Sequence, residues 1–173
     1  MPSDRSRLPL PGGPPADPAP DDPGVRAWAL LLRTHAALVP VLSRDLEAAG
    51  HLPLRHYDVL LELNAAPDRK LRMQELGNRV VLSRSQASRV VDELAVTGLA
   101  CREPDPSDRR GAYAVLTDAG RNALRAAAPV YLAGIAEHFT DHLTRDEVSA
   151  LQQGLTRVLA ALDGSAARRR PGA

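Results

Sequence analysis

Two arginines and an aspartate stand beside a glycine between two short apolar runs, as Asp108, Arg109, Arg110 and Gly111. An arginine at a hairpin tip can enter a minor groove, where narrow A·T-rich segments concentrate negative potential. Asp108 would orient these arginines through charge-assisted hydrogen bonds, and Gly111 would supply backbone freedom for the turn. The alternative is a solvated hairpin turn. The residue types therefore predict either a finger that binds DNA or an ordinary surface loop.

A second set of polar side chains shares one helix, expected over residues 83–97. At 100° per residue its buried face would comprise Ala87, Val90, Val91 and Leu94. The candidate DNA-binding residues outside that face are Ser83, Arg84, Ser85, Gln86, Ser88 and Arg89. Arginine pairs with guanine, glutamine with adenine, and serine with bases or phosphates, and a major groove about 12 Å wide admits a helix. An ordinary solvated helix surface is the alternative.

Charge is distributed unevenly along the chain. The net charge is only +1, but the stretch 69–89 contains six basic residues and one acidic residue, Glu75. A local basic surplus of this kind is typical of a surface that binds a polyanion. The helix over 83–97 lies at the end of that stretch, and the loop with Arg109 and Arg110 follows soon after it. This context favours nucleic-acid binding for both sets of residues.

The elements that must position these residues are mostly helices. Apolar spacing predicts helices over 25–49, from Pro53 to the break at Pro67, over 71–79, over 83–97, over 118–142 and over 144–162. Ser83 and Gln86 form a capping-box pattern, Gly98 is expected just after the helix end, and Thr117 is expected as an N-cap. Two short strands, 99–103 and 112–116, flank the charged loop. The predicted fold is mainly α, a winged helix-turn-helix with a two-stranded wing.

Composition and missing motifs narrow the class of protein further. With 44% hydrophobic and 25% charged residues the chain has an ordinary globular composition. It has no uninterrupted apolar run near the roughly 20 residues of a transmembrane helix, and its Pro-rich start is unlike a secretory signal. A single cysteine suits a reducing cytosol. Phosphate-binding loops and the HExxH and GxSxG motifs are absent from the sequence, so we expect a cytoplasmic, non-enzymatic protein without a cofactor.

The chain resembles the MarR family of transcriptional regulators over residues 25–162. The resemblance rests on Asp108 and Arg110 followed by Leu116, Thr117 and Gly120, which match the family's D-x-R…L-T-x-x-G wing signature, and on Leu94 to Leu99 after the helix that begins at Ser83. It implies a homodimer that represses transcription from a pseudo-palindromic operator. The implied organisation is a Pro-rich disordered tail (1–24), a helical dimerisation region formed by the N- and C-terminal helices (25–50 and 118–162), a DNA-binding winged domain (53–117) and a second tail (163–173).

The resemblance also implies release of DNA by a small phenolic or aromatic effector. The candidate effector-binding residues are Trp28, His35, Val39, His56 and Tyr57, with Arg55 beside them, although Trp28 and Tyr57 also suit an interface or a core. A zinc-responsive regulator would need more than the His138 and His142 pair, so we expect no metal site. A thiol-responsive regulator would need an exposed Cys101, which we expect to be buried. A regulator without an effector remains the third alternative.

Overall fold

The computed structural model describes residues 22–168, with the backbone alone at Arg109, Arg110 and 163–168. Its elements are α1 (Pro23–Ala48), α2 (Leu54–Ala65), η1 (Pro67–Arg69), β1 (Lys70–Arg72), α3 (Met73–Arg79), α4 (Arg84–Val96), β2 (Ala100–Asp105), β3 (Asp108–Leu116), α5 (Asp118–His138), η2 (Thr140–His142) and α6 (Arg145–Arg168). Predominantly helical structure with a small sheet confirms the predicted fold class.

The described chain forms two compact units, which divide within α1 between Ala37 and Leu38. The first unit contains the beginning of α1, and the second contains the winged helix-turn-helix with α5 and α6. Although charged and polar residues such as Arg33 and His35 interrupt its apolar run, α1 is long and apolar enough to cross a membrane. That test uses length and composition only, and the core helices of soluble proteins pass it as well. Leu42 and Leu46 near the end of α1 are buried in the core.

Helix α4 is built from local signals that the sequence contains. Ser83 accepts a hydrogen bond from the Gln86 N–H, and the Gln86 side chain accepts one from the Ser83 N–H at 2.9 Å, so the predicted capping box is confirmed. The predicted buried face is also confirmed. At the other end Gly98 has a φ of +72°, and the Leu99 N–H donates to the Leu94 carbonyl at 2.9 Å. These contacts fix both ends of α4.

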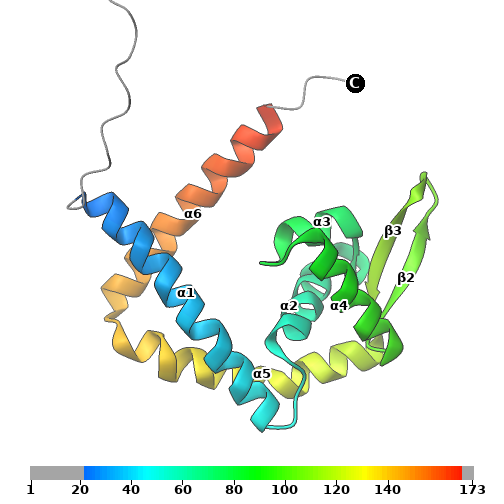
Figure 1. Ribbon diagram of the computed structural model, residues 1–173, viewed down its shortest axis with the longest axis horizontal. Helices are drawn as coiled ribbons and strands as arrows, with labels where there is room; N and C mark the ends of the chain where they lie inside the picture. The colour runs from blue at the N-terminus through cyan, green and yellow to red at the C-terminus, as the bar shows by residue number, and fades with distance from the viewer. Residues whose placement is uncertain (1–21, 169–173) are drawn as a thin grey trace, which may run out of the picture. The chain divides into compact units, whose positions relative to one another are not determined.

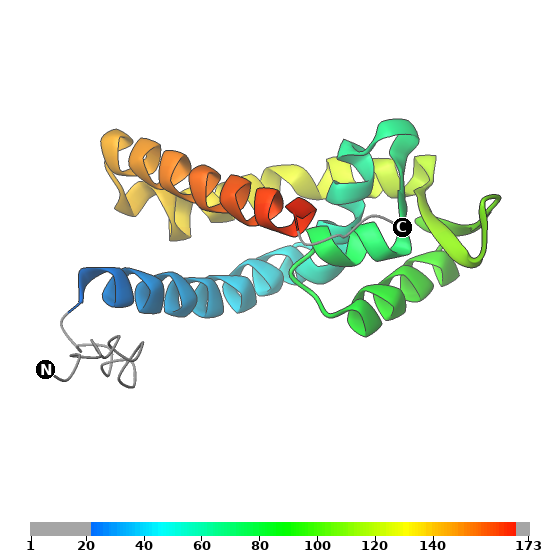
Figure 2. The same cartoon turned by 90° about the horizontal axis from the view of Figure 1, so that it is seen from above.

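The sheet has three antiparallel strands in the order β1-β3-β2, which corrects the predicted two-stranded wing. Residues 70–72 pair with β3, with Arg72 opposite Tyr113, and helix α3 begins only at Met73 rather than at the predicted residue 71. Leu71 is buried between the half-buried Lys70 and the exposed Arg72 of this short strand. The strands β2 and β3 are longer than predicted and leave a two-residue turn at Pro106 and Ser107. The hairpin projects beyond α4 (Figures 1 and 2).

The ends of the last two helices differ from the prediction. Helix α5 stops at His138 because Phe139 has non-helical angles, and η2 follows, so His138 and His142 do not share one helix face. His138 instead lies 2.8 Å from the Asp45 carboxylate of α1 through its Nε2 atom. Helix α6 continues to Arg168, past the expected start of a tail at 163. Residues 1–21 of the first predicted tail and 169–173 of the second lie outside the described residues.

Candidate nucleic-acid interface

The six residues predicted to contact DNA are the N-cap Ser83 and five residues of α4. All are exposed except Ser88, which is half-buried. The capping box orients the carboxamide of Gln86, and the hydroxyl oxygens of Ser83 and Ser85 lie 3.2 Å apart at the start of the helix. These polar groups therefore gather in the first turn of α4, the part of a recognition helix that contacts base edges in helix-turn-helix proteins.

Ser88 and its neighbour Asp92 are already bonded to the wing. Arg102, on β2, donates from Nη2 to the Ser88 hydroxyl at 2.8 Å and from Nε to the Asp92 carboxylate at 2.8 Å. Arg102 also reaches the Ser88 carbonyl at 3.1 Å. This guanidinium therefore joins the middle of α4 to the first wing strand. Sequence reasoning missed it, because the two positions lie 14 residues apart in the chain.

The structure divides the basic stretch 69–89 into paired and unpaired cations. Arg69 bonds to Asp118 at 3.2 Å, Arg72 to Asp105 at 2.9 Å and Arg79 to Glu75 at 2.6 Å. Within residues 22–168, Arg84 and Arg89 have no ion-pair partner. The remaining basic residue, Lys70, lies over the Tyr113 ring with its Nζ 5.4 Å from the centroid. The two arginines with free charge both belong to α4.

Asp105 is a structural residue that the sequence analysis did not single out. It is the buried charged residue of the described core, with 5% of its surface exposed. Its carboxylate accepts the hydroxyl and the N–H of Ser107 at 2.7 and 2.9 Å and the Arg72 guanidinium at 2.9 Å. The Ser107 hydrogen bonds, and then the charge of Arg72, hold the pKa of Asp105 below its usual range. Asp105 therefore stays ionised at the base of the hairpin turn.

Gly111 serves a different purpose from the one predicted. Its φ is not positive, so it is not needed for a left-handed turn. A Cβ at this position would lie 3.1 Å from the Cβ of Asp105 and 3.3 Å from its Oδ2 atom. The missing side chain thus makes room for the buried carboxylate. The side chains of Arg109 and Arg110 lie outside the described residues, and their place in β3 is known from the backbone.

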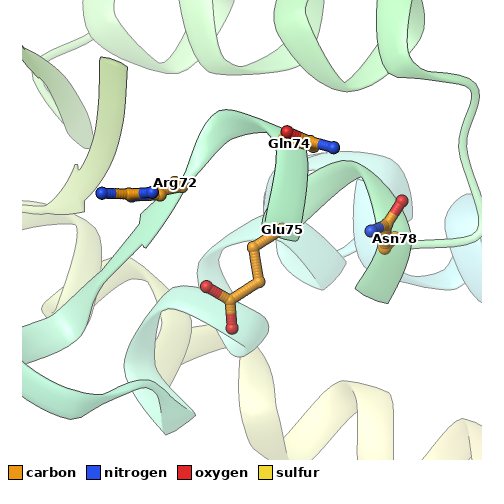
Figure 3. Close-up of a pocket in the computed structure, with 4 residues that line it drawn as sticks. All are labelled: Arg72, Gln74, Glu75 and Asn78. Atoms are coloured by element: carbon orange, nitrogen blue, oxygen red, sulfur yellow. The ribbon is translucent and has the colours of Figure 1, made fainter. Parts of the chain in front are cut away.

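Two cavities flank the start of α3. One, of about 300 Å³, is lined by Arg72, Gln74, Glu75 and Asn78, which Figure 3 shows arrayed around the helix with Arg72 pointing away from it. The other, of about 280 Å³, is lined by Arg72, Met73, Gln74, Asp105, Asp108, Gly111 and Ala112. Arg72 belongs to both linings. This arginine therefore stands between the helix-turn-helix and the wing.

The residues predicted to bind an effector have different environments. Tyr57 is buried and packs on Tyr131, with ring centroids 4.5 Å apart, so it is a core aromatic. Trp28 is 60% exposed, and His35 and Val39 are also exposed. His56 contacts the Glu93 carboxylate of α4 at 2.9 Å through Nε2. Burial, followed by the charge of Arg55, lowers the pKa of His56 against the opposing influence of Glu93, so this contact is a hydrogen bond from a neutral imidazole at neutral pH.

The prediction that Cys101 is buried is wrong. Cys101 is exposed on β2, because side chains alternate along a strand and Ala100 takes the inward position. As for metals, no group of three or more potential ligand side chains occurs among the residues that the structure describes.

A short helix, a tight turn, a capped second helix and a hairpin define a winged helix-turn-helix protein. A family model described as the MarR family matches residues 52–111. AbsC, a MarR family transcriptional regulator from Streptomyces coelicolor, is 30% identical with a TM-score of 0.72, and the match covers 86% of this chain and 99% of AbsC. The chain belongs to the MarR family of transcriptional regulators, as the sequence resemblance predicted.

Two further relatives support this assignment. Sco3205, a MarR family regulator from the same organism whose structure contains DNA, is 32% identical with a TM-score of 0.69, over 79% of this chain and 85% of Sco3205. The HTH-type transcriptional regulator YkoM from Bacillus subtilis is 36% identical over 80 residues, which are 46% of this chain. That match spans 51% of YkoM, about half the length of this curated relative.

Proposed function

We propose that this protein is a sequence-specific DNA-binding repressor that places α4 in the major groove and the β2–β3 hairpin in the adjacent minor groove. The observation that carries the proposal is the charge on α4. Its inner face is buried and its ends are capped, while Arg84 and Arg89 point outward without an ion-pair partner among the described residues. Free guanidinium groups on a rigid helix can pair with base edges or phosphates. The Sco3205 complex with DNA adds support from a relative.

Replacing the wing arginines tests this proposal. We expect Arg109→Ala and Arg110→Ala each to weaken DNA binding roughly tenfold, the scale of one lost charge-assisted contact. The measurement is a titration of the full chain against a duplex that the wild-type protein selects from a random library. Arg145→Ala, an exposed arginine in the first turn of α6, is the control and should bind as the wild type does. Unchanged affinity in both wing variants would reject the minor-groove contact.

We also propose that the protein acts as a homodimer through residues 25–50 and 118–162, with residues 53–117 binding DNA. Large apolar side chains are exposed along α1 and α6, namely Val25, Trp28, Leu30, Leu31, Leu32, Leu151, Leu155, Val158, Leu159 and Leu162. A hollow of about 510 Å³ lies along α6, with Leu143, Leu151 and Leu155 in its lining. Large apolar side chains exposed in such number are typical of a protein interface. Two-fold symmetry would match a pseudo-palindromic operator.

A charged residue on the apolar side of α6 should break this dimer. We expect Leu155→Glu and Leu159→Glu to shift the protein to a monomer, because an unpaired carboxylate in an apolar interface is strongly unfavourable. Light scattering at a fixed protein concentration measures the change. Gln153→Glu is the matched control, since residue 153 lies on the opposite side of α6 at 100° per residue. A wild-type protein that is monomeric in this experiment would overturn the dimer model.

Release of DNA by a small aromatic effector is the regulatory part of the proposal. Family membership supports it; of the candidate residues Trp28, His35 and Val39 are exposed and His56 is half-buried, while Tyr57 belongs to the core. A titration of phenolic acids into the DNA complex tests it, and no release by any of them would argue against this class. A thiol-responsive regulator is the second candidate, favoured by the exposure of Cys101 on the wing. Loss of peroxide sensitivity in Cys101→Ser would identify that alternative.

A further inference from the structure

Arg72 occupies a position where an arginine does not stabilise its own helix. It is the N-cap residue of α3, but its side chain makes no capping hydrogen bond. Serine, threonine, aspartate and asparagine are the residues that stabilise a helix from this position. Arg72 is also the last residue of β1, directly opposite Tyr113 in the sheet. The guanidinium therefore acts away from its own helix, toward the wing.

The contacts of Arg72 reach three separate parts of the wing. Nη2 lies 2.9 Å from the Asp105 carboxylate at the end of β2 and donates to the Ser107 hydroxyl in the turn at 2.9 Å. Nε donates to the Tyr113 hydroxyl on β3 at 3.1 Å. A planar guanidinium can hold several acceptors in fixed directions, whereas a lysine ammonium is a single point on a flexible stem. These bonds use both Nε and Nη2 of Arg72, which a lysine side chain cannot reproduce.

The buried carboxylate at the centre of this network is contacted on several sides. The Asp105 side chain is 2% exposed, and Ser107 and Arg72 bond to its two oxygens. On its other side Asp105 packs against Gly111, so closely that a Cβ on the glycine would lie 3.1 Å away. A buried carboxylate without partners is strongly unfavourable. Removing Arg72 would therefore disturb the position of Asp105 and of the segment that packs on it.

That segment contains the two wing arginines. Pro104 pairs with Ala112 and Asp105 pairs with Asp108, so the register shifts between these pairs and residues 109–111 form a bulge on β3. Bulges bend a strand and redirect its side chains. The Arg72 network holds the residues at both sides of this bulge. It also connects the bulge to α3, the first helix of the helix-turn-helix.

We propose that Arg72 is a positioning residue that, through Asp105 and Ser107, holds the 109–111 bulge in the shape that presents Arg109 and Arg110 to DNA. This inference rests on the proposed DNA-binding function of the wing. In this proposal Arg72 does not itself contact DNA, because its guanidinium is already paired with Asp105.

Conservative replacement separates positioning from charge. In the full chain, titrated against the duplex selected by the wild-type protein, we expect Arg72→Lys and Arg72→Met each to lose roughly tenfold in affinity. Lys70→Met removes a charge two residues before Arg72 on β1. Its loss of DNA affinity should be smaller than that of Arg72→Lys. Wild-type affinity in Arg72→Lys, or a larger loss in Lys70→Met, would show an electrostatic role and overturn the proposal.

A second background tests whether Arg72 acts through the wing arginines. In a chain carrying Arg109→Ala and Arg110→Ala, the Arg72→Met change should cost little further affinity, because the groups it positions are gone. Losses that multiply independently would overturn the proposal. If the Arg109→Ala, Arg110→Ala chain itself binds as tightly as the wild type, the proposed wing contact with DNA fails.

Hydrogen exchange in the free protein tests, without DNA, whether Arg72 holds the wing in place. We expect Arg72→Lys and Arg72→Met to accelerate amide exchange over residues 101–116, with exchange in α5 unchanged as the check of folding. Unchanged exchange over the wing would overturn the proposal. Accelerated exchange would support the positioning role of Arg72 even if the wing arginines proved unnecessary for DNA binding. Failure of the positioning role and failure of the proposed wing contact are therefore distinguishable.

Discussion

Gly120→Ala is expected to destabilise the protein by about 3 kcal/mol or more, because its side chain would overlap backbone atoms. A Cβ on Gly120 would lie 1.9 Å from the Leu99 carbonyl oxygen and 2.9 Å from the Leu99 carbonyl carbon. The carbonyl cannot easily move aside, since it accepts a hydrogen bond from the Thr117 N–H at 3.3 Å. Thr117 in turn donates to the Gly98 carbonyl at 2.7 Å and accepts from the Gly120 N–H at 3.0 Å.

Urea unfolding at a fixed protein concentration measures this effect, since stability of an oligomer depends on concentration. Gly77→Ala is the matched control. Gly77 also lies inside a helix, but the nearest atom to an added Cβ is the flexible Arg84 Cγ at 3.4 Å. The control should change the free energy of unfolding by less than about 1 kcal/mol. Equal stability of Gly120→Ala and the wild type would show that α5 can move away from Leu99 without loss of stability.

This contact explains the spacing of Leu116, Thr117 and Gly120 in the wing signature. Thr117 caps α5 and ties its first turn to the loop that leaves α4. The two backbones approach so closely that only glycine fits at position 120. The first turn of α5 therefore packs directly on the loop that leaves α4. Through this contact a movement of α5 would reach the end of α4.

Arg89→Ala is expected to lose base preference as well as affinity, by about 1–3 kcal/mol for a contact to guanine. Arg89 is exposed on α4 and has no ion pair within the described residues. It lines a hollow of about 280 Å³ with Arg55, Gln86 and Glu93. The charge is therefore available for a partner outside the chain.

Titration of the selected duplex and its single-base variants measures the preference. Arg125→Ala, which removes an exposed arginine of α5, is the control and should leave both affinity and preference unchanged. A uniform loss across all duplexes, with a salt slope smaller by about 1, would identify Arg89 as a phosphate contact instead. An unchanged affinity would remove Arg89 from the DNA-binding surface altogether.

The parts of the fold that depend on neighbouring residues were predictable. The capping box of Ser83 and Gln86, the buried face of α4 and the αL residue Gly98 depend on positions within one or two helical turns. Their periodicity and caps can be read directly from the chain. Thr117 as the N-cap of α5 belongs to the same class. The wing signature then identified the family, which the structural relatives confirm.

The parts that depend on distant pairing were not predictable. Strand β1 has three residues, too few for a periodic pattern, and exists because it pairs with β3 about forty positions later. The exposure of Cys101 follows from the register of β2 against β3. His138 pairs with Asp45, 93 positions away, where sequence spacing had paired it with His142.

The amino-acid sequence by itself determined the helices, their caps, the charged surface of α4 and the family. Tertiary structure decided which cations of the basic stretch 69–89 have an ion-pair partner. Of the cations in the basic stretch, Arg69, Arg72 and Arg79 are engaged by carboxylates, and only contacts between separate elements could neutralise the first two. The physical reason is that periodicity and capping act over a few residues, whereas a salt bridge requires two side chains that the fold, not the chain order, brings within about 4 Å.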